Sequence, residues 1–168
     1  APGRRAGHLR VAGPVVGLHP MFGPDVGSLV KQVIVVCPGR DEASCDWLLR
    51  QFEVWGALLR DEQAAVHDRA MQLIQAMRHF TSITYGVFLE RQSADLGQLL
   101  RLSSPIYRLE LAMVGRLFAQ SPMLYADIML QADMLPNLIE AYRDALDELL
   151  VLVRNGDRDA LIARFREG

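Results

Sequence analysis

The sequence has few of the features that mark specialised classes of protein. Its 168 residues include only two cysteines, carry a net charge of −2 and are 7% aromatic. Cys37 and Cys45 are too few for a disulfide framework or a cysteine-ligated metal centre, and we expect both to be reduced. The chain has no excess of basic residues, which argues against nucleic acid as a partner. No uncharged apolar run approaches the ~20 residues that span a bilayer, and no apolar stretch of a signal peptide follows the basic start. These absences predict a cytoplasmic globular protein that binds neither nucleic acid nor membrane.

The pattern of predicted elements changes near residue 61. Strand-like runs at 15–18 and 32–37 precede a helix over 41–55 that ends at Gly56, and a short strand follows at 57–60. After Asp61, a plausible N-cap, nearly everything is helical, with helices expected over 62–91, 95–101, 105–120, 122–131, 137–154 and 158–166. The sequence therefore predicts a mainly α fold. Residues 1–60 are expected to form the last strands and helix of a doubly wound α/β sheet, and residues 61–168 an all-helical domain.

A single histidine lies at a rigid point of the first part. His19 follows the first strand-like run, which we expect to be buried, and Pro20, Gly23 and Pro24 force the chain into an ordered loop after it. Open α/β sheets place their chemistry at the carboxyl ends of strands, so His19 is a candidate site residue. A histidine that only hydrogen-bonds within a turn fits the same pattern.

Two arginines stand on a helix with apolar side chains on every face. Ser104 as N-cap and Pro105 at the first helical position predict its start, and the apolar faces predict that it is largely buried. Arg108 and Arg116 lie about 80° and 12 Å apart on an ideal helix, and Glu110 has the wrong spacing to pair with either. A buried arginine needs an anion, which could be a carboxylate of another helix or subunit, or of a ligand.

The predicted 62–91 helix is apolar on more than one side, so we expect partner helices to cover it. On an ideal helix His79 points roughly 120° away from His67, which shares a face with Arg78. His67 and Arg78 are therefore interpreted as a structural polar pair or a solvated edge. The acidic residues near Asp144 have no histidine beside them, so no metal site is expected.

Several segments together carry a family resemblance: the His19 loop, Trp55-Gly56, the QAMRHF run at 75–80 and all of 103–120. From about residue 13 to about 127 without an obvious gap, the chain resembles the prephenate dehydrogenases of tyrosine biosynthesis. The likeness is greatest to the bifunctional forms that are fused to chorismate mutase. It implies that 1–60 is the C-terminal remnant of a dinucleotide-binding domain. It also implies that 61–168 is a truncated helical substrate-binding domain that forms a homodimer.

The resemblance implies roles at matching positions. His19 falls on the catalytic histidine, which must be neutral to accept a hydrogen bond from the ring hydroxyl of prephenate as hydride leaves for NAD. Arg116 falls on the arginine that binds the ring carboxylate, and Arg108 on a second substrate-binding arginine. His79 falls on a histidine near the pyruvyl side chain and the feedback effector tyrosine. Pro20 and Met21 are implied to contact NAD, and no metal is required.

The chain departs from this family pattern at both ends. It contains no Gly-x-Gly-x-x-Gly loop, and relatives continue through more helix beyond Phe165. We therefore expect a fragment of an NAD-dependent prephenate dehydrogenase. The alternative is a helical dimerisation or effector-binding module without catalysis. The residues fit either prephenate or arogenate as substrate and either NAD or NADP as cofactor, with or without a fused mutase domain.

Overall fold

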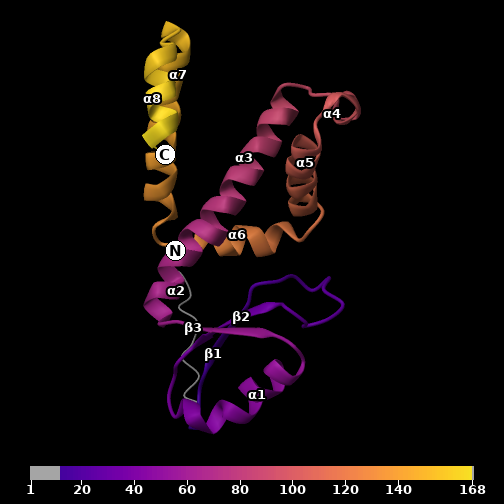
Figure 1. Cartoon of the computed structure of the whole chain (residues 1–168), viewed down its shortest axis with the longest axis vertical. Coiled ribbons are helices and arrows are strands. Elements are labelled where there is room, and N and C mark those ends of the chain that lie inside the picture. Colours follow the sequence, from indigo (N-terminus) through magenta and orange to yellow (C-terminus); the bar gives the residue numbers. More distant parts are fainter. Residues whose placement is uncertain (1–11, 168) are drawn as a thin grey trace. The chain divides into compact units, whose positions relative to one another are not determined.

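The computed structural model describes residues 12–167, which fall in two compact units divided between Ala70 and Met71. Residues 1–11 of the expected first domain lie outside the described part. Figure 1 shows the helices and strands of each unit.

The first unit is built on a three-stranded mixed sheet. Its strands are β1 (Gly17–Pro20), β2 (Val33–Cys37) and β3 (Leu58–Asp61), in the order β1-β2-β3. β1 runs antiparallel to β2, whereas β2 and β3 are parallel. The parallel pair is joined through a short 3-10 turn, η1 (Glu42–Cys45), and helix α1 (Asp46–Val54), which contacts β3. Parallel strands are usually joined by such a crossover helix. The observed order β2, α1, β3 confirms the strand, helix and strand predicted after residue 32.

One face of this sheet forms the core of the unit. Along β2 the side chains alternate, with Ile34 and Val36 buried and Val35 only half-buried. Successive side chains of a strand point to opposite faces, so Ile34 and Val36 define the covered face and Val35 marks the other. β1 is exposed or half-buried along its length, so the prediction that the strand leading to His19 is buried was wrong.

Local backbone chemistry ends α1 where the sequence predicts. Gly56 has φ +86° and donates its N–H to the Glu53 carbonyl at 2.8 Å, while Ala57 donates to the Phe52 carbonyl at 3.0 Å. These two bonds make a Schellman motif, which requires a left-handed residue and therefore favours glycine.

The rest of the chain is helical. The helices are α2 (Ala64–Met71), α3 (Arg78–Arg91), α4 (Leu96–Leu102), α5 (Pro105–Phe118), α6 (Pro122–Leu130), α7 (Leu135–Asn155) and α8 (Arg158–Glu167). A π-helical segment, Gln72–Met77, joins α2 to α3. Asp61 is the last residue of β3 rather than a helix N-cap, and α2 begins three residues later. Among residues 12–167, no helix has both the length and the apolar composition needed to cross a bilayer.

In the second unit, α3 packs beside α5, and α7 and α8 lie side by side (Figure 1). Its core is small and sits where the π-helical segment meets the end of α6 and the start of α7. The buried members are Ala76, Met77, Ala132 and Leu135.

Helix α5 is not buried as its composition predicts. Val114 is its only buried residue, and Ile106 exposes 82% of its surface. Apolar side chains on every face predict burial only if every face has a neighbour. Within the described chain, α3 is the main helix that packs on α5.

Candidate active site

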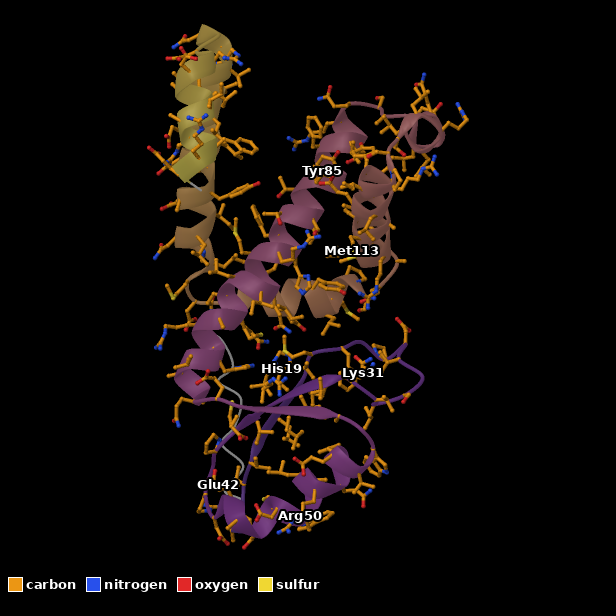
Figure 2. The ribbon with its side chains drawn as sticks, viewed as in Figure 1. His19, Lys31, Glu42, Arg50, Tyr85 and Met113 are labelled. Atoms are coloured by element: carbon orange, nitrogen blue, oxygen red, sulfur yellow. The ribbon has the colours of Figure 1, made fainter. Side chains whose placement is uncertain are left out.

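His19 lies inside β1 rather than in the loop after it. In the β1–β2 ladder His19 pairs with Val35, and the next residue, Pro20, ends the strand. Directly opposed residues of an antiparallel pair point to the same face, so His19 shares the face of Val35 and points away from the covered Ile34 and Val36. The ladder thus holds the His19 backbone in place and leaves its half-buried imidazole on the less covered face (Figure 2).

His67 of α2 contacts His19 directly. Nδ1 of His19 lies 2.8 Å from Nε2 of His67, and the two rings meet edge to face with centroids 5.0 Å apart. Nδ1 of His67 in turn lies 2.9 Å from Oδ1 of Asp68. His67 was expected to form a polar pair with Arg78 or a solvated edge. Both interpretations were wrong for His67, because Arg78 instead donates to the hydroxyl of Ser82 and the side chain of His67 is only 15% exposed.

The electrostatics around His19 favour its neutral form. Burial lowers the pKa of His19 below the usual value of 6.5, and the coulombic effect of the neighbouring His67 lowers it further. At neutral pH the imidazole is therefore uncharged and keeps one nitrogen lone pair, which is the form that can accept a proton.

Pro20 and Met21 follow His19 at the end of the strand. Pro20 has no N–H to donate, and the Met21 N–H is already bonded to the Val33 carbonyl at 2.9 Å. Their backbone donors are thus not available for a phosphate. What these two residues can offer a cofactor is apolar side-chain contact.

The other three predicted site residues belong to the second unit. His79, near the start of α3, is half-buried and meets the ring of Tyr125 edge to face at 4.6 Å between centroids. Burial lowers the pKa of His79, and the charge of the adjacent Arg78 lowers it further. His79 is therefore neutral at neutral pH.

Arg108 and Arg116 are both exposed on α5, so the expectation of buried guanidinium groups was wrong. Nε of Arg108 donates to the Ser103 hydroxyl at 3.3 Å. Within residues 71–167, no hydrogen bond or ion pair joins His79, Arg108 and Arg116, and neither arginine has a carboxylate within 4.0 Å. An exposed arginine is hydrated and does not require an anion, so the argument from burial does not apply to this single chain.

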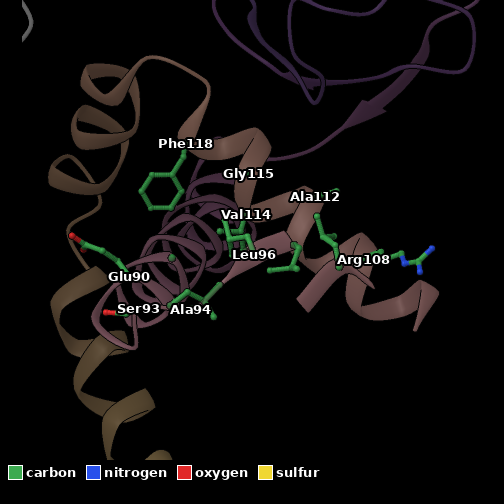
Figure 3. Close-up of a pocket in the computed structure, with 13 residues that line it drawn as sticks. Glu90, Ser93, Ala94, Leu96, Arg108, Ala112, Val114, Gly115 and Phe118 are labelled. Carbon is green, nitrogen blue, oxygen red and sulfur yellow. The ribbon is translucent and has the colours of Figure 1, made fainter. Parts of the chain in front are cut away.

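A cavity of about 600 Å³ lies between α3, α4 and α5. Figure 3 shows Arg108 at one side of it with the guanidinium extended outward. The lining is almost wholly apolar, and Glu90 and Arg108 are its charged members. This lining suits apolar side chains better than a dicarboxylate.

No group of three histidine, cysteine, aspartate or glutamate side chains that could hold a metal ion occurs in the described part of the chain. Cys37 and Cys45 are free thiols. The chemically distinctive arrangement is therefore the pair of histidines with Asp68. His67 was missed because its partner on β1 is 48 residues away in the sequence.

Comparison with known proteins identifies the family. The family model for the prephenate dehydrogenase dimerization domain matches residues 63–167. The T-protein of Enterobacter agglomerans is 54% identical over 153 residues, and that of Haemophilus influenzae is 48% identical over 155 residues. These alignments cover 91% and 92% of this chain but 41% of each relative, so the chain spans about two fifths of their length.

Solved structures share the fold. The prephenate dehydrogenase of Aquifex aeolicus, solved in complex with hydroxyphenyl propionate and NAD+, superposes with a TM-score of 0.64 at 17% identity. The match covers 90% of this chain and 56% of that one. The predicted order of a helical domain after a few strands is confirmed by this match and by the family model. The chain belongs to the prephenate dehydrogenase family.

Proposed function

We propose that this chain supplies the proton-accepting and substrate-binding residues of an NAD-dependent prephenate dehydrogenase. The enzyme converts prephenate to 4-hydroxyphenylpyruvate by oxidative decarboxylation, in the tyrosine branch of aromatic amino acid biosynthesis. The observation that carries the proposal is the family match over 63–167, together with 54% identity to a T-protein over most of the chain. Because the chain is similar to T-proteins, the protein that carries it is also proposed to include a fused chorismate mutase domain. The free thiols of Cys37 and Cys45 suit a reducing compartment such as the cytoplasm.

His19 accepts the proton in this mechanism. Its lowered pKa keeps the imidazole neutral, and a ring nitrogen accepts a hydrogen bond from the ring hydroxyl of prephenate. As hydride leaves the carbon that bears this hydroxyl, the O–H bond breaks and its proton passes to His19, so that a carbonyl forms. The ring carboxylate then leaves as carbon dioxide, its bonding electrons make the ring aromatic, and the oxygen recovers a proton.

NAD, when bound, supplies the hydride acceptor. The described residues fit only a small part of it. Pro20 has no N–H and that of Met21 is bonded to Val33, so these two residues can only pack against an apolar ring. The chain contains no Gly-x-Gly-x-x-Gly loop to hold the pyrophosphate. We therefore assign Pro20 and Met21 a packing role toward the cofactor.

Arg116 is proposed to bind the ring carboxylate of prephenate, and Arg108 to support substrate binding. A guanidinium fork matches a carboxylate bidentately, and both side chains are exposed and free of ion pairs within the described residues. His79 is proposed to lie near the pyruvyl side chain and to take part in feedback inhibition by tyrosine.

The test of His19 is the His19→Asn variant of the protein that carries this chain. Loss of a general acid-base group typically costs 10²–10⁴-fold in turnover, and we expect little change in the KM for prephenate. Near-normal formation of NADH by this variant would remove His19 from the mechanism.

The test of Arg116 is Arg116→Gln beside Arg108→Gln, with Arg101→Gln on α4 as the control. A hydrogen bond to a charged group is worth roughly 1.5–3 kcal/mol, which raises the KM for prephenate about 10- to 150-fold. The KM for NAD should stay unchanged. An equal rise for NAD, or an effect as large in the control, contradicts the assignment.

A second candidate function, a non-catalytic dimerisation or effector-binding module, is favoured by the description of the matching family model as a dimerization domain. Steady-state assays on the protein that carries this chain distinguish the two. NADH formation that depends on prephenate and His19 contradicts the module, whereas tyrosine binding without any turnover supports it.

A further inference from the structure

The hydrogen bonds around His19 form a chain of three side chains. Nδ1 of His19 meets Nε2 of His67 at 2.8 Å, and Nδ1 of His67 meets Oδ1 of Asp68 at 2.9 Å. The side chain of His67 is 15% exposed and that of Asp68 is 75% exposed. The middle member is therefore shielded, while the carboxylate at the end is in contact with water.

The position of each proton follows from the chemistry of these groups. An ionised carboxylate can only accept hydrogen bonds, so Nδ1 of His67 carries a proton. In a neutral His67, Nε2 then holds a lone pair and must accept. Its partner Nδ1 of His19 therefore carries a proton and donates. In neutral His19 this leaves the lone pair on Nε2.

We propose that His67 and Asp68 are positioning residues that hold His19 in the tautomer whose Nε2 accepts the proton of the substrate hydroxyl. The proposal rests on the proposed function of His19 and adds the nitrogen that reacts and the groups that select it. Without such a partner an imidazole exchanges between two tautomers, and only one of them presents an acceptor at Nε2.

The same contacts act after proton transfer. When Nε2 has taken the hydroxyl proton, His19 is an imidazolium that still donates from Nδ1 to His67. The edge-to-face packing of the two rings, at an interplanar angle of 81°, also restricts rotation of the His19 ring.

Substitutions of His67 separate positioning from general stability. His67→Leu removes the acceptor, whereas His67→Gln keeps a carbonyl oxygen near the position of Nε2. Loss of the partner that orients a metal-ligating histidine typically costs 10- to 100-fold in activity, and by analogy we expect His67→Leu to lower kcat by about that factor. We expect His67→Gln to recover most of the loss, and Asp68→Asn to cause a smaller one. The KM values and the urea midpoint should change little.

Arg69→Gln is the matched control, because Arg69 is exposed on the same helix. It should leave kcat unchanged. Equal losses in His67→Leu and His67→Gln, or a loss of kcat that follows the loss of stability, would reduce His67 to a structural role and overturn the proposal.

A spectroscopic measurement tests the tautomer without turnover. In the whole protein labelled with ¹⁵N-histidine, at a pH where His19 is neutral, we expect its Nδ1 to be protonated and its Nε2 to be unprotonated. His67→Leu should shift His19 toward a mixture of tautomers. An Nε2-protonated His19 in the unmodified protein overturns the proposal. If the tautomer is as expected but His19→Asn keeps full activity, the proposed function fails instead, so the two failures are distinguishable.

Discussion

Gly39 offers a sharp test of how the first unit holds His19. A Cβ added at Gly39 would lie 2.1 Å from the carbonyl oxygen of Val15 and 2.8 Å from its carbonyl carbon. Both are backbone atoms, so no side-chain rotation relieves the clash. Val15 is also tied in place, because its N–H donates to the Arg40 carbonyl at 2.8 Å. Gly39→Ala must therefore displace the segment that leads into β1, the strand that carries His19.

The expected cost follows from this geometry. Adding a methyl group to a site without room costs typically 1–3 kcal/mol, and we expect the free energy of unfolding to fall by about that amount. Gly27→Ala is the control, since an added Cβ there meets nothing within 4 Å. That variant should be neutral or up to about 1 kcal/mol more stable, because alanine restricts the unfolded chain. Urea denaturation of both variants measures the difference, and NADH formation in the protein that carries this chain reports on His19. If Gly39→Ala is as stable as Gly27→Ala, the described contact between residues 15 and 39 is wrong.

Three further predictions concern pH, capping and assembly. The pKa values of His19 and His79 are lowered in the folded chain, so between those values and 6.5 the unfolded state binds more protons. The free energy of unfolding should therefore fall as pH drops from 7 through this window, and urea midpoints that do not change between pH 7 and 5 contradict this. The kcat/KM of the protein that carries this chain should also fall with pH below 6.5. Ser104→Ala removes the side-chain acceptor that lies 3.3 Å from the Tyr107 nitrogen, and it should lower the free energy of unfolding by about 0.5–2 kcal/mol. An unchanged urea midpoint would mean that the cap does not stabilise the chain. The purified 168-residue chain should sediment as a dimer or larger species, because its helices expose apolar residues, and a stable monomer would refute this. The same chain should form no NADH from prephenate and NAD, because it has no glycine-rich phosphate loop, and measurable NADH would refute that expectation.

Helix boundaries were predictable where a local chemical signal sets them. Ser104 accepts a hydrogen bond from the Tyr107 N–H at the start of α5, and Asp95 accepts one from Gln98 at the start of α4. Gly156, at φ +64°, ends α7 with the same pair of bonds that Gly56 makes after α1. Each of these signals acts within about five residues, so sequence patterns are sufficient to read them.

Features that depend on distant residues were not predictable. The apolar pattern gave one helix over 62–91, but a π-helical segment interrupts it at Gln72–Met77. A π-helical turn holds more residues than an α-helical turn, so side-chain directions calculated for an ideal α-helix do not carry from His67 across to His79. The contact between His67 and His19 likewise depends on how α2 packs on the sheet. No periodicity in the sequence contains that information.

The error about α5 connects the two proposals that concern the second unit. Arg116 and apolar side chains such as Ile106 and Met113 are exposed on the same helix. A hydrated guanidinium gains little from one more carboxylate, because the pair forms in water of high dielectric constant. If a second copy covers the apolar side chains of α5, it also removes water from the arginines of that helix. A substrate carboxylate then becomes the anion that a desolvated arginine requires. On this reasoning, self-association would create the electrostatic conditions for the proposed binding of a carboxylate.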